Sequence, residues 1–209
     1  MSGITDLLNS DIGRQLVHGV SEETNQPENK TAEVVKLALP LLMGAMRRNA
    51  SDPRGAERLI EALDKKHDGS ILDNLGAFFE GGVDDEQKLD GLGILGHVLG
   101  GSQNNVVGAL SKKSGMDSNS VMQILQVAAP IILGYLGRQK RQNQISSPNA
   151  LEGLLGGLMG GGNRQQRKQQ SLIEALLDGD NDGSVVDDIA GMVLGGKKKG
   201  GLLGSLFGR

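Results

Sequence analysis

The chain has 209 residues, a formal net charge of −3 and no cysteine. Without cysteine, disulfides, thiolate metal sites and a cysteine nucleophile are excluded. The slight negative charge gives no reason to expect nucleic-acid binding, and three Phe and one Tyr, with no Trp, offer little surface for base stacking. A chain of this length suits one repeated domain or two small ones.

The first residues and the apolar runs bear on localisation. Residues 1–6 lack the basic region and the long apolar core of a signal peptide. The longest apolar runs, residues 37–46 and 127–137, are about half the length that a membrane-spanning helix needs. We therefore expect a soluble, cytoplasmic protein.

Apolar residues recur every three to four positions along the chain, and no strand-like alternation is found, so the predicted fold class is all-α. Thr31 is expected to cap a helix that runs through Met46 and that is kinked or divided by Pro40. Pro130 should have the same effect on a helix that is capped by Asp117 or Ser118. The remaining helices are expected over residues 4–8, 12–20, 54–63, 71–79, 90–99 and 104–110.

Two parts of the chain repeat each other at a constant offset of 90 residues. Residues 37–46 align with residues 127–136, each around a proline, and Ser21 aligns with Ser111. We predict two tandem copies of a small multi-helix unit, residues 1–83 and 91–196, joined by a short glycine-rich bridge. The second copy carries an insertion, residues 138–170, that is expected to be flexible.

An acidic loop in the second copy has the spacing of a calcium site. Carboxylates stand at positions 1, 3 and 5 of residues 178–189, and the glycine at position 6 permits the sharp turn that such loops make. Position 12 is Ile189 instead of the usual bidentate Glu, so the loop is similar to the shortened calcium loops of dockerin-like domains. The alternative is an Asp/Gly-rich turn. The predicted ligands are Asp178, Asp180, Asp182, the carbonyl of Ser184, and Asp187 or Asp188.

A degenerate version of this loop occupies residues 64–75 of the first copy. Residues 59–63 are identical to residues 172–176, and Asp64, Asp68 and Asp73 keep three of the acidic positions. Lys66 stands where the second loop has Asp180, and an ammonium group at a ligand position opposes a dication. We predict a metal-free turn in which Lys66 supplies part of the missing charge. His67 aligns with Asn181 and is expected to be solvated.

Two segments of high positive charge stand outside these loops. Residues 138–142 and 163–170 are basic and glutamine-rich, which predicts a solvated helix end and a flexible stretch, with binding of an anionic polymer as the alternative. The tail, residues 197–209, joins three lysines to a short apolar end. It is expected to be disordered, and weak contact with an anionic membrane surface or a protein partner is the functional alternative.

The paired proline helices, the helix–acidic loop unit and the glycine-rich tail together resemble the YidB-like family of bacterial domains of unknown function. This resemblance covers most of residues 1–196 and implies a small helical bacterial domain, with no established activity and no catalytic residue to transfer. No Ser-His-Asp or His-x-x-x-His arrangement is present, so no enzyme activity is expected. The favoured function is a non-enzymatic calcium-binding or self-assembly module with a protein partner. The alternatives are a metal-dependent enzyme that uses the acidic loop, and membrane-surface association through the tail.

Overall fold

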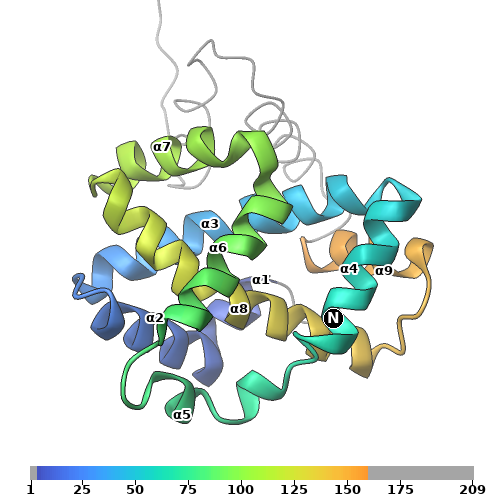
Figure 1. Ribbon diagram of the computed structural model, residues 1–209, viewed down its shortest axis with the longest axis horizontal. Coiled ribbons are helices and arrows are strands. Elements are labelled where there is room, and N and C mark those ends of the chain that lie inside the picture. Colours follow the sequence, from blue (N-terminus) through green and yellow to red (C-terminus); the bar gives the residue numbers. More distant parts are fainter. Residues whose placement is uncertain (1–3, 160–209) are drawn as a thin grey trace, which may run out of the picture.

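A computed structural model describes residues 4–159, and every regular element within that range is a helix (Figure 1), which confirms the all-α prediction. Side chains from both predicted copies contribute to one continuous hydrophobic core. The copy boundaries at residues 83 and 91 stay a prediction. The elements are α1 (Ile4–Asn9), α2 (Asp11–Glu23), α3 (Glu28–Ala50), α4 (Pro53–Lys65), the 3-10 turn η1 (Ser70–Asp73), α5 (Leu75–Phe79), α6 (Asp85–Leu99), the 3-10 turn η2 (Gly100–Ser102), α7 (Gln103–Ser114), α8 (Ser118–Gln142) and α9 (Pro148–Leu158).

The two longest helices, α3 and α8, form the centre of the molecule and contact each other (Figure 1). Each contains a proline as its thirteenth residue, Pro40 in α3 and Pro130 in α8, and neither helix is divided there. Helix α2 and helix α7 each pack against both central helices. The helices that align at the offset of 90, α2 with α7 and α3 with α8, therefore hold similar positions in one shared core.

Pro130 has a packing consequence on α8. Its ring nitrogen carries no hydrogen, so the carbonyl of Gln126, four residues earlier, has no helical hydrogen-bond partner. Helix α6 approaches this carbonyl closely at Gly91, where a methyl group would lie 1.9 Å from the Gln126 oxygen. The glycine thus permits the close contact between α6 and α8, and its Cα–H groups face the freed carbonyl.

The turns that follow α2 and α7 have matching hydrogen bonds. The hydroxyl of Ser21 donates to the carbonyl of Gln26, and the hydroxyl of Ser111 donates to the carbonyl of Met116, both at 2.6 Å. These residues differ by 90 in number. The backbone between them turns through a left-handed residue in both places, Asn25 with φ 50° and Gly115 with φ 67°.

Part of the predicted flexible insertion is folded. Residues 138–142 are the last turn of α8, and residues 148–158 form α9, whose buried leucines enter the core. Helix α9 packs against both α3 and α4, and it begins with a proline, as α4 does (Figure 1). The prediction of a flexible segment was therefore wrong for residues 138–142 and 148–158, which are helical, while residues 160–170 lie outside the described range. The buried leucines are Leu151, Leu154, Leu155 and Leu158.

Helix α8 is longer than the apolar run from which it was predicted. By length and composition alone, its 25 residues could cross a membrane, so the expectation that the apolar run is too short does not hold for the helix. Its most apolar 18-residue stretch is 83% buried inside the protein. The central helix of a folded core passes the same test.

The start of α3 also differs from the prediction. The helix begins at Glu28 after Pro27, so Thr31 lies within its first turns and caps nothing. The Thr31 side chain is fully buried, and its hydroxyl has no hydrogen-bond partner within residues 4–159. Val121, which aligns with Thr31 at the offset of 90, is equally buried in α8.

Glu23, at the end of α2, fixes the bridge between the two predicted copies. Its carboxylate accepts a hydrogen bond from the backbone N–H of Val83 at 2.8 Å and pairs with Lys88 at 2.8 Å. Burial alone would raise the pKa of Glu23, but the hydrogen bonds from Lys88 and Val83 outweigh it and hold the pKa below the usual value. The bridge is thus anchored to α2 before α6 begins.

Candidate functional site

The first acidic loop is built by a helix end, a left-handed glycine and a 3-10 turn. The backbone N–H groups of Lys66 and His67 both donate to the carbonyl of Ala62, which ends α4. Gly69 follows with φ 97°, a conformation that favours glycine, and η1 begins at the next residue. The carboxylate of Asp68 accepts a hydrogen bond from the Ser70 N–H at 2.9 Å. Hydrogen bonds from Ser70, and to a lesser extent the nearby Arg141, lower the pKa of Asp68.

Two glycines on α8 form the surface on which this loop lies. A methyl group on Gly137 would lie 1.8 Å from the carbonyl oxygen of His67, and one on Gly134 would lie 2.5 Å from the Ile71 side chain. Both glycines are buried, and a spacing of three residues places them on one face of α8. Larger residues at these positions would push the loop away from the helix.

Three basic side chains near the end of α8 reach the three carboxylates of the loop. The ammonium nitrogen of Lys140 lies 2.5 Å from Asp64, and Arg141 lies 3.3 Å from Asp68. Arg138 pairs with Asp73 and also donates to the carbonyl of Gly69 at 3.2 Å. Each acidic position that the first loop shares with the predicted calcium loop is therefore neutralised by a cation of the protein itself.

These contacts correct two predictions. The basic stretch 138–142 is not simply a solvated helix end, because Lys140 is buried and Arg138 is mostly covered by the loop. Lys66 is exposed and forms no ion pair within the described part of the chain. The compensating charge thus comes from α8, between 65 and 76 positions away in the sequence, and not from Lys66.

His67 is buried, contrary to the expectation of a solvated loop residue. Its side chain is 8% exposed, and its Nε2 atom lies 3.8 Å from the carboxylate of Asp90 on α6. Burial lowers the pKa of His67 from its ordinary value of 6.5, Asp90 opposes this shift, and Lys66 adds to it. The alignment with Asn181 did not reveal this burial, which arises from the packing of the loop between α6 and α8.

The predicted metal ligands Asp178, Asp180, Asp182, Ser184, Asp187 and Asp188 all lie outside the described residues, as does the tail 197–209. Between residues 4 and 159, no group of three or more His, Asp or Glu side chains is arranged to hold a metal ion. The three carboxylates of the first loop instead point to separate cations along α8. That arrangement can fix the loop on α8, and it supplies no nucleophile or base for chemistry.

The functional residues that sequence reasoning missed are Arg138, Lys140 and Arg141. Their basic run was visible, but the partner of that run was not, because the pairing depends on how α8 packs against the loop. One signal was available. Three carboxylates close together in a turn that is predicted to bind no metal favour positive charge nearby.

The sequence matches a family model described as a bacterial protein of unknown function (DUF937), over residues 6–139 and 141–209. The chain belongs to this family, in agreement with the resemblance found in its motifs. The searches of curated proteins and of solved structures found no match.

Proposed function

We propose that this protein is a non-enzymatic calcium-binding module whose ion site is the acidic loop at residues 178–188. The ligands would be the side chains of Asp178, Asp180 and Asp182, the carbonyl of Ser184, and Asp187 or Asp188. Calcium takes six to eight oxygen ligands, and this donor set contains only oxygen. Without the bidentate Glu at position 12, the affinity should be weak, on the order of 10⁻⁵ to 10⁻³ M.

The observation that carries this proposal is the neutralisation of the first loop. The aligned stretches are residues 64–74, with three Asp and two Lys and hence a formal charge of −1, and residues 178–188, with five Asp and hence −5. Even the less acidic loop is held by three cations from α8. A stretch with a charge of −5 needs more positive charge than this. A divalent cation would supply that charge, and Asp180 offers it a carboxylate where the first loop has Lys66.

The same comparison argues against an enzyme. A metal-dependent enzyme needs an open coordination position with a base or nucleophile beside it. The first loop gives no indication of such chemistry, because its one histidine is buried against Asp90 and its carboxylates are all engaged. We therefore assign the second loop to ion-dependent folding and interaction.

Isothermal titration calorimetry on the full chain tests the proposal. Calcium should bind the unaltered protein and the Asp68→Ala variant, and Asp182→Ala should abolish the binding heat. Asp68 and Asp182 hold the same position in the two loops, so the pair is a matched control. No saturable heat at millimolar calcium, or equal binding by Asp182→Ala, would show that the loop is only a turn.

A further inference from the structure

An arginine-rich corner joins α3 to α4. Only Ser51 and Asp52 connect the two helices, and the Asp52 carboxylate caps α4 by accepting a hydrogen bond from the Gly55 N–H at 2.9 Å. A methyl group on Gly55 would lie 2.0 Å from the carbonyl oxygen of Asn49, so the helix ends are in close contact. Four arginines lie on the last turn of α3 and the first two turns of α4, namely Arg47, Arg48, Arg54 and Arg58. We call these four residues the arginine corner.

Three residues of the arginine corner carry positive charge that no ion pair within residues 4–159 balances. Arg14, Arg138 and Arg141 are each in an ion pair. In contrast, Arg47, Arg54 and Arg58 have no ion-pair partner within residues 4–159. Of these three, Arg54 and Arg58 are exposed, and a spacing of four residues places them on one face of α4.

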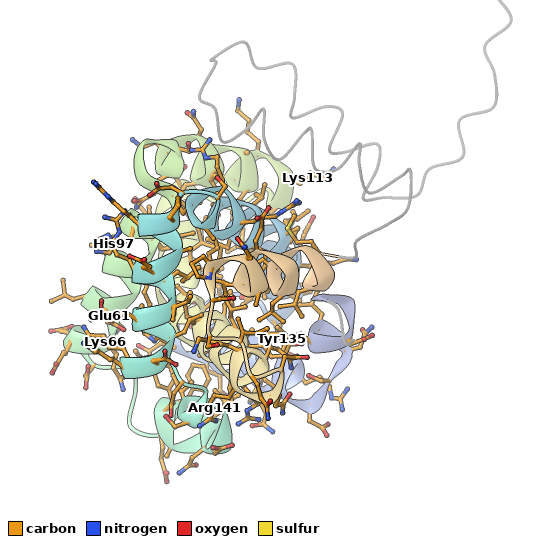
Figure 2. The ribbon with its side chains drawn as sticks, turned by 90° about the vertical axis from the view of Figure 1, so that its right-hand side faces the viewer. Glu61, Lys66, His97, Lys113, Tyr135 and Arg141 are labelled. Atoms are coloured by element: carbon orange, nitrogen blue, oxygen red, sulfur yellow. The ribbon has the colours of Figure 1, made fainter. Side chains whose placement is uncertain are left out.

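The acidic groups near the arginine corner are few and partly engaged. Asp52 holds the cap of α4, and Glu61 pairs with Lys65 at 2.6 Å. Glu57 is exposed on α4 between the two arginines. The end of α6 borders the corner, because the Asn49 side chain donates to the carbonyl of His97 at 3.1 Å, and Figure 2 shows His97 on the same side of the molecule as Glu61 and Lys66.

The described part of the chain ends beside the arginine corner, and an acidic stretch of the same chain follows in the sequence. Helix α9 packs against α3 and α4, the two helices that form the arginine corner, and Met159 follows it directly. Asp178 is 19 residues further along the chain. A segment of that length is long enough to reach any part of the corner, and joining two partners in one chain gives an effective concentration on the order of millimolar.

We propose that the acidic stretch 178–188 of the same chain docks on the arginine corner. The structure contains a precedent, since the first acidic loop is held on the end of α8 by Arg138, Lys140 and Arg141. At the offset of 90, Arg48 aligns with Arg138, and the end of α3 aligns with the end of α8. Charge complementarity between a stretch of −5 and a group of arginines favours the contact.

The contact differs from the one on α8 in a way that preserves the ion site. At the offset of 90, Arg47 aligns with Gly137. A side chain at Gly137 would collide with the His67 carbonyl of the first loop, so a second loop that lay equally close to α3 would collide with Arg47. In the proposed docking, the second loop would lie further from the helix than the first loop does, and long guanidinium groups would meet its outer face. Bound calcium would leave a formal charge of −3 on the stretch, enough for the arginines to attract. The docking therefore does not depend on the proposed calcium function.

External nucleic acid is the less suitable occupant. Recognition of single strands relies on aromatic side chains beside the basic groups. In the described range, Tyr135 is buried, while Phe78 and Phe79 pack edge to face with each other, and Phe79 lies against Gly19 of α2. None of these aromatic residues belongs to α3 or α4.

Spin-label distance measurements on the full chain test the docking. The chain has no cysteine, so Ser51→Cys and Asn181→Cys place two nitroxides without other changes. Neither residue is charged, and Asn181 is not a predicted ligand. The distance distribution should be short and narrow, and it should lengthen and broaden when Arg54→Gln and Arg58→Gln are added. It should be retained with Arg54→Lys and Arg58→Lys, and also with Lys36→Gln and Lys112→Gln, which remove the same charge elsewhere.

The outcomes separate the two proposals. A broad distribution in every protein, or a narrow one that persists in the Arg→Gln variant, overturns the docking. Repeating the measurement with a chelator and with millimolar calcium should give a narrow distribution in both conditions. If calorimetry detects no calcium while the docking survives, the calcium function fails alone. If calcium binds but the distances stay broad, the docking fails alone.

Discussion

At the scale of single residues, burial explains where the sequence-based predictions failed. Thr31 has the residue type of a helix cap, and His67 lies in a polar stretch, yet both side chains are buried. Residue type and local pattern indicate what a side chain can do, but its burial depends on elements far away in the sequence. For His67 those elements are α6 and α8, which contribute Asp90 and Gly137.

Replacing Thr31 by valine should stabilise the protein. The buried hydroxyl has no hydrogen-bond partner among the described residues, and Val121 shows that valine fits the aligned position in α8. Removing an unsatisfied buried hydroxyl should raise the free energy of unfolding by about 1 kcal/mol. Urea denaturation measures this, with Thr24→Val as the control, because the Thr24 hydroxyl donates to the Val20 carbonyl at 2.7 Å. That control should be no more stable than the unaltered protein, and a gain of equal size would contradict the account.

His67 should make stability depend on pH. Burial lowers its pKa in the folded state, so the unfolded chain binds a proton first as the pH falls below about 6.5. The free energy of unfolding should therefore decrease as the pH falls from 6.5 towards the folded pKa, and His67→Gln should remove this part of the dependence. Urea midpoints at several pH values, compared with those of His97→Gln, measure the effect. Identical pH profiles for the two variants would rule out the role of His67.

At the scale of elements, the sequence specified the helices better than their limits and contacts. The apolar runs around Pro40 and Pro130 predicted the two central helices, and Asp117 was one of the two expected caps of α8. Helix α9 was missed because glycine disfavours helix, and its burial against α3 and α4 outweighs that preference. The three cations of α8 could not be paired with the loop from the sequence, because side-chain pairing across 65 or more positions follows from packing.

The glycine surface on α8 should be intolerant of side chains. Gly137→Ala places a methyl group 1.8 Å from the His67 carbonyl oxygen, so the loop must move away. Gly108→Ala on α7 meets no atom within 4 Å and should stabilise by about 0.5–1 kcal/mol through helix propensity. Thermal unfolding should show opposite signs for the two variants. A stabilised Gly137→Ala protein would mean that the loop does not lie on this surface.

The pair of Lys140 and Asp64 should respond unequally to the loss of either partner. The Lys140 side chain is 8% exposed, whereas that of Asp64 is 53% exposed. Asp64→Asn leaves a buried ammonium group without its anion, while Lys140→Met leaves a carboxylate that water can solvate. Urea denaturation should therefore show a larger loss of stability for Asp64→Asn. Equal losses would indicate that Lys140 is solvated in the folded protein.

At the scale of the whole molecule, side chains from both predicted copies contribute to one core, and the two aligned acidic stretches differ in formal charge. The first stretch has a formal charge of −1, and its carboxylates are neutralised by three cations of α8. The second stretch, residues 178–188, has a formal charge of −5 and contains no basic residue. The offset of 90 predicts the duplication from the sequence alone. The neutralisation of the first loop could not be predicted, because the fold brings Arg138, Lys140 and Arg141 to it.

The proposal that only the second loop needs calcium is tested most directly by the melting temperature with and without calcium. The measurement compares the unaltered full chain with its Asp180→Lys and Lys66→Asp variants. Asp180→Lys gives the second loop the lysine of the first, and Lys66→Asp makes the reverse change in a loop already filled by α8. Calcium at ten times its dissociation constant stabilises by about 1.4 kcal/mol, which corresponds to a rise of a few degrees. We predict that rise for the unaltered protein and for Lys66→Asp, and none for Asp180→Lys. A rise that persists in Asp180→Lys, or no rise in any of the three proteins, would contradict the account.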